Sequence, residues 1–95
     1  MKGYVYILQS LKNQRFYIGS TSDLRRRLID HNLGKSRYTS FNRPFELVFS
    51  QEYLNLIEAR KVEYKLKSFK SRKILEKIIE NGFCSINVSD ARLKP

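Results

Sequence analysis

Side chains able to handle a phosphate group recur near the start of the sequence. Tyr6 and Tyr17 lie in two short apolar runs that are close enough to form a hairpin, and Arg27 and His31 are four positions apart. Positions four apart share one face of a helix, so a helix here would bring the guanidinium and the imidazole together. A guanidinium binds phosphate oxygens through paired hydrogen bonds, and phenol and imidazole groups can transfer protons. These residues predict a site for phosphate chemistry in the first third of the chain.

Hydrophobic periodicity predicts the elements that position this site. Residues 3–9 and 16–19 alternate in the manner of strands, which places Tyr6 on one face and Val5 and Ile7 on the other. Gly19 is expected to end the second strand, where the backbone bends or lets a ligand approach. The segment from Ser20 to Asp23 offers N-cap oxygens for a helix over 24–32, which Gly34 ends.

The second half of the chain predicts one more strand and two helices. Residues 45–53 form the third strand, and the continuous apolar stretch from Leu47 to Phe49 indicates burial on both faces. Helices follow over 56–69 and 72–80, capped by Asn55 and Ser71, with a core stripe on the second that includes Ile74. A short strand at 85–88 is a further expectation. The order β-β-α-β-α-α indicates an α+β fold with a small antiparallel sheet flanked by helices.

The helix over 24–32 carries polar residues where apolar ones are expected. Leu24, Arg27, Leu28 and His31 form one stripe. Burial of a guanidinium without a partner is costly, so Arg27 needs an acidic neighbour or an anionic ligand. The alternatives are a salt bridge from Arg27 to a glutamate and, for His31, a hydrogen-bonded histidine of the core.

Glu63 shows the same anomaly on the helix over 56–69. It lies at roughly 40° from Ala59, inside the arc of core residues. A carboxylate in such a place usually binds a cation or a buried arginine. Glu63 is therefore the candidate metal ligand, and a salt bridge to Arg27 or Lys67 is the alternative.

The chain is strongly basic, and the excess is uneven. The formal net charge is +10, and residues 1–45 hold nine basic and two acidic side chains whereas residues 46–95 hold ten and seven. A basic excess around a candidate site attracts a polyanion; the alternative is a basic surface without a ligand. The candidates for contact with a nucleic-acid backbone or an exposed base are Arg25, Arg26, Lys35, Arg37, Tyr38, Phe41 and Arg43.

Composition excludes several other classes. No apolar run is long enough to span a bilayer, no signal peptide is recognisable, and Cys84 is alone, which excludes an internal disulfide and a cysteine-rich zinc site. We expect one domain over residues 1–95, with a core of about residues 3–80 and a tail over 83–95, located in the cytoplasm.

The sequence closely resembles the GIY-YIG nuclease family. The first half-motif is present as Tyr4-Val5-Tyr6, with Tyr4 where the name has glycine, and the second matches as Tyr17-Ile18-Gly19. The spacing that follows, through Arg27 and His31 to Glu63, also fits the family pattern. Tyr4 departs from the motif at a position that contributes the backbone of a strand.

The resemblance covers about residues 3–80. In its length, and in the passage His31-Asn32-Leu33-Gly34-Lys35…Tyr38-Thr39, the chain looks like the short stand-alone YhbQ-like branch, which has no added DNA-binding domain.

The resemblance implies a three-stranded antiparallel sheet with flanking helices and divalent-metal-dependent cleavage of DNA phosphodiester bonds. Carried over residue by residue, the catalytic set is Tyr6, Tyr17, Arg27, His31 and Glu63. Because Glu63 is the only carboxylate in this set, a single Mg²⁺ or Mn²⁺ ion is expected, with no small-molecule cofactor and no membrane partner. The substrate is expected to be DNA, with RNA as an alternative, cut in a structure-dependent or nonspecific way in repair or recombination.

Roles follow for the individual groups. Tyr6 is favoured as the general base, with the pKa of its phenol lowered by the metal and Arg27, and Tyr17 as an orienting partner. Arg27 would stabilise charge in the transition state, and His31 would relay a proton or hold a phosphate. The rival hypotheses are a nucleic-acid-binding module with the same fold and no significant catalysis, and a protein-interaction domain.

Overall fold

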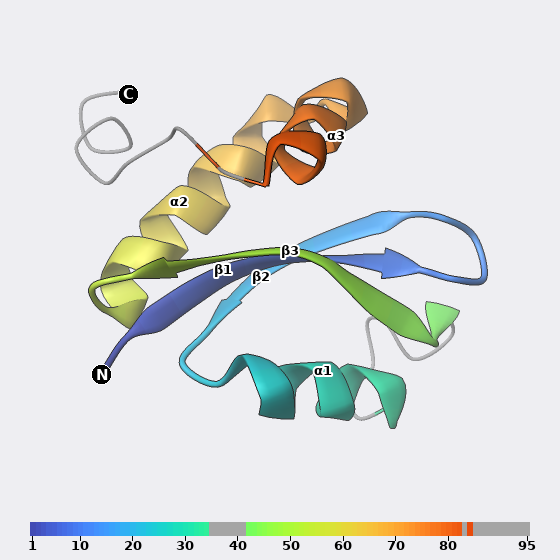
Figure 1. Cartoon of the computed structure of the whole chain (residues 1–95), viewed down its shortest axis with the longest axis horizontal. Coiled ribbons are helices and arrows are strands. Elements are labelled where there is room, and N and C mark those ends of the chain that lie inside the picture. Colours follow the sequence, from blue (N-terminus) through green and yellow to red (C-terminus); the bar gives the residue numbers. More distant parts are fainter. Residues whose placement is uncertain (35–41, 83, 85–95) are drawn as a thin grey trace.

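A three-stranded antiparallel sheet separates two layers of helices. The computed structural model describes residues 1–34, 42–82 and 84. Strands β1 (Gly3–Ser10), β2 (Phe16–Thr21) and β3 (Phe45–Tyr53) are ordered β2-β1-β3, and helices α1 (Leu24–Asn32), α2 (Leu56–Phe69) and α3 (Arg72–Asn81) complete the fold. Helix α1 covers one face of the sheet, and α2 and α3 cover the other (Figure 1). The predicted fold class and element order are confirmed.

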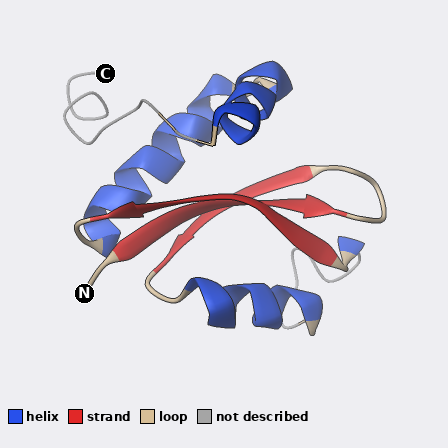
Figure 2. Cartoon of the chain, viewed as in Figure 1, coloured by secondary structure: helices blue, strands red, loops and turns tan. Residues whose placement is uncertain are grey.

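Each face of the sheet has its own hydrophobic core. Val5 and Ile7 of β1 point toward α2 and pack with Val62 and Leu66, whereas Tyr6 and Leu8 point toward α1 and pack with Phe45 among other residues. This alternation follows from the two-residue period of a strand. Figure 2 shows the two layers on either side of the strands.

A β-bulge explains how the third strand buries neighbouring residues. The register passes from Ile7 opposite Phe49 to Leu8 opposite Leu47, so Val48 is the additional residue. Phe49 and Val48 then both pack on the α2 side, while Leu47 packs on the α1 side. The predicted burial of this stretch on both faces is confirmed, and the bulge is the local geometry that produces it.

Polar side chains begin all three helices. Asp23, Asn55 and Ser71 each accept a hydrogen bond from a backbone N–H in the first turn of α1, α2 and α3. Gly34 and Gly82 have positive φ values of 78° and 71° just after α1 and α3, which is the conformation expected after a helix end.

Two details of the third helix differ from expectation. Helix α3 extends to Asn81 rather than residue 80, and Ile74 is 38% exposed because Ile78, Leu75 and Ile79 fill the contact with the core. The strand expected at 85–88 lies outside the described residues. Within the described ranges, no helix has the length and apolar character needed to cross a membrane.

Gly19 lies inside β2 rather than at its end, because the strand continues to Thr21. It stands opposite Tyr6 in the sheet. A Cβ atom at this position would be 2.2 Å from the Tyr6 hydroxyl oxygen. The glycine is therefore needed so that the Tyr6 phenol can lie across the edge strand.

We expect Gly19→Ala to lower the free energy of unfolding by about 1–3 kcal/mol, because the added methyl group forces the phenol aside. In a Tyr6→Ala background, the same substitution should change stability by less than about 1 kcal/mol, since the obstacle is gone. Urea unfolding of the four proteins of this cycle measures both values. An equal cost in the two backgrounds would contradict the explanation.

Candidate active site

Tyr6 and His31 form a buried pair between the sheet and α1. Tyr6 is 6% and His31 8% exposed. The Tyr6 hydroxyl and His31 Nε2 are 3.4 Å apart and form a hydrogen bond, and the two rings meet edge to face with centroids 6.3 Å apart. His31 is therefore a hydrogen-bonded histidine of the core, which confirms that alternative. The same hydrogen bond connects it to Tyr6, the candidate general base.

Tyr17 belongs to the same aromatic cluster but its hydroxyl is bound elsewhere. Its ring contacts Phe45 at 5.3 Å between centroids, and Phe45 in turn contacts His31 at 5.8 Å. The Tyr17 hydroxyl accepts a hydrogen bond from Asn42 Nδ2 at 2.6 Å. Tyr6 and Tyr17 therefore share one face of the sheet, and Tyr17 is held by a residue that no spacing pattern in the sequence singled out.

Asn32 fastens the last turn of α1 to the beginning of β3. Its Oδ1 accepts from the backbone N–H of Phe45 at 2.6 Å, and its Nδ2 donates to the Phe45 carbonyl at 3.3 Å. These bonds fix α1 along the sheet next to His31. Asn32 was missed as a positioning residue because its sequence context indicates only the end of a helix.

Arg27 is exposed, which corrects the expectation that it faces inward. Relative to Leu24, it lies at roughly −60° around the helix. Leu24, Leu28 and His31 fill the central line, so the long side chain extends from the edge of the stripe into solvent. Within the described ranges no carboxylate forms an ion pair with Arg27, so the expected salt bridge to a glutamate is not observed there.

The charge of Arg27 nevertheless acts on the buried pair. Burial raises the pKa of Tyr6; Arg27 opposes this rise and Glu63 adds to it. Burial lowers the pKa of His31, Arg27 lowers it further, and Asp30 opposes both. At neutral pH both rings are therefore uncharged. The expected lowering of the Tyr6 pKa is not found in the protein alone, because burial outweighs Arg27.

Glu63 reaches the edge of the sheet from the opposite layer. It accepts a hydrogen bond from the Ser20 hydroxyl, and its other oxygen pairs with Lys67 Nζ at 2.7 Å. Its side chain is 19% exposed. The expected alternative of a salt bridge to Lys67 is confirmed, and a pair with Arg27 is not observed among the described residues.

Ser20 explains how groups from both layers come together. It follows Gly19, across which the Tyr6 phenol lies, so the Glu63 carboxylate bound to Ser20 is close enough to raise the pKa of Tyr6. The sequence indicated Ser20 only as one of several N-cap oxygens, and Asp23 is the actual cap. Strand β2 is thus where the Tyr6 phenol and the Glu63 carboxylate approach each other from opposite faces of the sheet.

The donor set fits a single oxygen-binding cation better than an enclosed metal cage. Among the described residues, no three His, Cys, Asp or Glu side chains form a group able to hold a metal. Glu63 is partly exposed and already attracts the Lys67 ammonium. One carboxylate completed by substrate phosphate and water is a common arrangement for Mg²⁺.

The remaining candidates for nucleic-acid contact are only partly placed. Arg25 and Arg26 are exposed on α1, and Arg43 is exposed just before β3. Lys35, Arg37, Tyr38 and Phe41 lie outside the described residues.

Sequence and structure comparisons identify the family of the chain. Residues 2–76 match the family model of the GIY-YIG catalytic domain. The chain belongs to the GIY-YIG family, a nuclease superfamily whose domains act on nucleic acids.

Within that family the chain is similar to UPF0213 proteins. It is 38% identical to one from Staphylococcus saprophyticus over 80 residues, which span 83% of this chain and 96% of that protein. It is 35% identical to YazA of Bacillus subtilis over 71 residues, 74% of this chain and 71% of the relative. The solution NMR structure of BH0048 from Bacillus halodurans aligns with a TM-score of 0.55 at 33% identity, covering 99% of this chain and 96% of that one.

The lowered pKa of His31 has a measurable consequence for stability. The unfolded chain binds the proton more tightly than the native protein, so the contribution is complete above about pH 6.5 and is lost as pH falls from there through the lower native pKa. In that window the free energy of unfolding should fall by up to about 1.4 kcal/mol per pH unit. Urea midpoints between pH 7.5 and 5 measure it.

His31→Gln is the control for that experiment, since His31 is the only histidine of the sequence. The variant should show a flatter profile over this range. A profile of unchanged slope would mean that another group carries the dependence.

Proposed function

We propose that this protein is a divalent-metal-dependent nuclease that hydrolyses DNA phosphodiester bonds, with Tyr6, Tyr17, Arg27, His31 and Glu63 as its active site. The observation that carries the proposal is that Tyr6 and Glu63 reach β2 from opposite faces of the sheet: the Tyr6 phenol lies across Gly19, and the Glu63 carboxylate accepts a hydrogen bond from Ser20. Burial raises the pKa of Tyr6, and the charges of Arg27 on α1 and Glu63 on α2 act on that pKa in opposite directions. A carboxylate has no role in simple phosphate binding, since it would repel the phosphate.

Tyr6 and His31 provide a route for the proton of the attacking water. Both are neutral, and their polar atoms are 3.4 Å apart. As the water oxygen bonds to phosphorus and the bond from phosphorus to the leaving oxygen breaks, the water's proton passes to the Tyr6 oxygen and the phenol's own proton passes to His31 Nε2. The leaving oxygen takes a proton from solvent. This relay avoids a free phenolate, whose formation is costly in a buried site. Tyr17, held by Asn42, orients the aromatic wall beside the pair.

Arg27 and Glu63 handle the charges of the substrate. Arg27 has no carboxylate partner among the described residues, so its guanidinium is available for the two non-bridging oxygens as negative charge grows. Glu63, positioned by Ser20, would hold a single Mg²⁺ or Mn²⁺ ion. That ion, when bound, supplies Lewis-acid stabilisation of the phosphate and the leaving oxygen.

A DNA- or RNA-binding module without significant catalysis is the second candidate. The Glu63–Lys67 ion pair favours it, because the carboxylate is neutralised without any metal. This candidate predicts nucleic-acid binding that is indifferent to divalent ions and no cleavage of any substrate.

Removal of either charged group tests the proposal. We expect Glu63→Gln and Arg27→Ala each to reduce cleavage by roughly 10²–10³-fold, since each removes stabilisation of the transition state. The measurement uses labelled single-stranded, nicked, flapped and branched DNA with Mg²⁺ or Mn²⁺.

Matched controls for these variants lie at exposed positions outside the candidate sites. Arg60→Ala on α2 and Glu80→Gln on α3 remove the same kinds of charge, and both should retain cleavage. If folded Glu63→Gln and Arg27→Ala proteins cut as well as these controls, the assignment is wrong.

Ser20 is expected to act through Glu63 as a positioning residue. Ser20→Ala should raise the Mg²⁺ concentration for half-maximal cleavage by about tenfold, because partners of a metal ligand typically contribute that much to affinity. The maximal rate at saturating Mg²⁺ should change less. Ser20→Thr should restore the midpoint, and Ser22→Ala serves as the neighbouring control; a loss of rate with an unchanged midpoint would contradict this role.

A further inference from the structure

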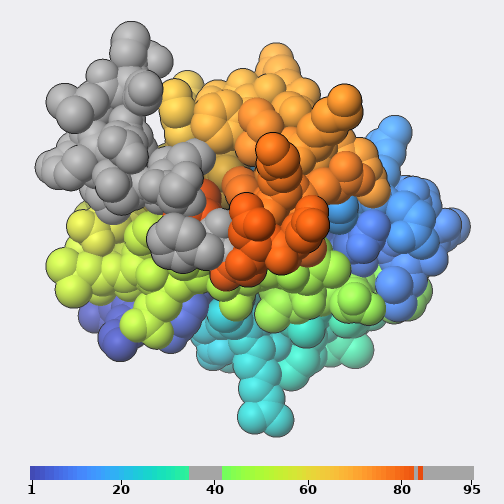
Figure 3. All heavy atoms as spheres, turned by 45° about the horizontal axis from the view of Figure 1, so that its top comes forward, coloured from blue at the N-terminus to red at the C-terminus, as the bar shows by residue number. Residues whose placement is uncertain are grey.

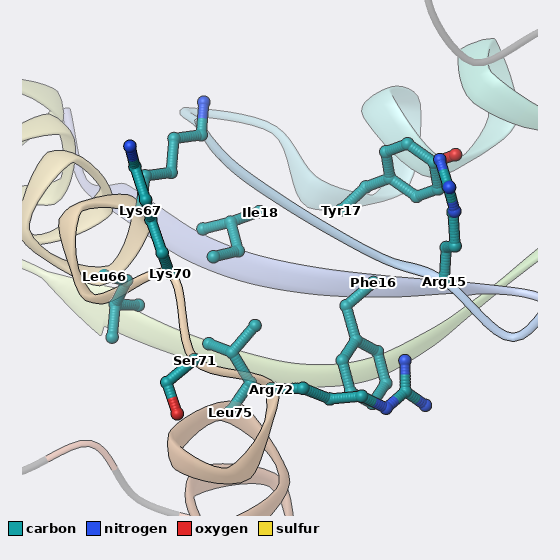
Figure 4. A pocket seen from close by; sticks show the side chains of 10 residues that line it. All are labelled: Arg15, Phe16, Tyr17, Ile18, Leu66, Lys67, Lys70, Ser71, Arg72 and Leu75. Carbon is teal, nitrogen blue, oxygen red and sulfur yellow. The ribbon is translucent and has the colours of Figure 1, made fainter.

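A groove borders the outer edge of β2, beside the candidate active site. It lies between that strand and the junction of α2 with α3, and its volume is about 380 Å³ (Figure 4). This volume is within the range of small-ligand pockets, roughly 300–1,000 Å³. Figure 3 shows the neighbouring β1–β2 turn lying against α3, where Arg72 donates a hydrogen bond to the Gln14 carbonyl at 3.0 Å.

Four cationic side chains line this groove: Arg15, Lys67, Lys70 and Arg72. None of the residues that line it is acidic. Lys67 and Arg72 have carboxylate partners, Glu63 and Glu76 respectively. Arg15 and Lys70 are exposed and form no ion pair with any described residue, so their charges are available to an anionic ligand.

The floor of the groove is apolar. Phe16 and Ile18 of β2 lie opposite Leu66 of α2 and Leu75 of α3. The Arg72 guanidinium lies over the Phe16 ring, 4.1 Å from its centroid, and the bond to Gln14 holds it there. Beside this stacked pair, Ile18 and Leu75 form an apolar part of the floor on which a flat ring can stack.

The combination selects one kind of ligand. The outer backbone of a duplex presents phosphates and sugars, so it has no use for an apolar floor. An unpaired nucleotide presents both an aromatic base and phosphates, which match the apolar floor and the cations. In Figure 4 the amines of Lys67 and Lys70 and the Arg15 guanidinium extend to the same side as the Tyr17 ring, with Ile18 between them.

We propose that this groove binds an unpaired nucleotide of a single-stranded segment, with its base on the apolar floor at Ile18 and Leu75 and its phosphates on Lys70 and Arg15. Lys67 connects the groove to the active site through its ion pair with Glu63 at 2.7 Å. Resting on the proposed nuclease function, the groove would favour substrates with a single-stranded region next to the bond that is cut.

Binding without divalent metal tests the groove separately from catalysis. The measurement is fluorescence anisotropy of a labelled single-stranded oligothymidylate and of a duplex of equal length, in EDTA at several salt concentrations. The test variant is Arg15→Gln with Lys70→Gln. The matched control is Arg60→Gln with Lys61→Gln, which removes the same charges from exposed positions of α2.

The groove variant should bind the single strand about tenfold more weakly than the control does. The slope of the logarithm of the binding constant against the logarithm of the salt concentration should become smaller in magnitude by about 1.4. Each lost phosphate contact of a single strand removes about 0.7 from this slope. Methyl NMR signals of Ile18 and Leu75 in the unaltered protein should shift when the oligonucleotide is added. Together these results support the proposal.

Three results would overturn it. Equal weakening by the groove and control variants would indicate general charge attraction, and an unchanged affinity would remove Arg15 and Lys70 from the interface. If duplex and single-strand binding weaken equally and the methyl signals of Ile18 and Leu75 do not shift, the groove contacts the backbone of a duplex instead. The nuclease proposal has its own test: it is wrong if folded Glu63→Gln cleaves normally. The binding measurement in EDTA would still show whether the groove binds a single strand, because it does not depend on cleavage.

Discussion

The contact between the Tyr6 phenol and the backbone of Gly19 is the constraint on which the site depends. In an antiparallel pair, opposite residues place their side chains on the same face, so a side chain at position 19 would occupy the space of the phenol. With that space free, Tyr6 lies across the edge strand and reaches His31 on α1. The next residue, Ser20, turns to the other face and holds Glu63 on α2.

This arrangement shows why the candidate site is at an edge of the sheet. A central strand would keep the α1 and α2 layers apart, whereas the outer strand β2 lets groups from both layers approach around its free side. The groove with Arg15 and Lys70 lies along this same side. Strand β2 thus borders both the residues proposed for chemistry and those proposed for nucleotide binding.

The sequence predicted most of the fold and part of the site. The two-residue period of a strand placed Tyr6 and Val5 on opposite faces of the sheet. Polar residues marked the starts of the helices, at Asp23, Asn55 and Ser71. Both signals are local in the sequence. The outward direction of Arg27, the bonds of Ser20 and Asn42, and the bulge at Val48 depend on how separate elements meet. No periodicity within one element contains that information.

The α1 layer has a small core, and residues of the proposed site, Tyr6 and Tyr17, form part of it. His31 is the one buried residue of α1, and it packs with Tyr6 and Phe45. A descendant that lost catalysis would still need these rings to keep α1 attached, so their retention in a related protein is weak evidence of activity. Arg27 and Glu63 contribute little to packing. These two positions therefore distinguish catalytically active relatives from relatives that keep only the fold better than the buried rings do.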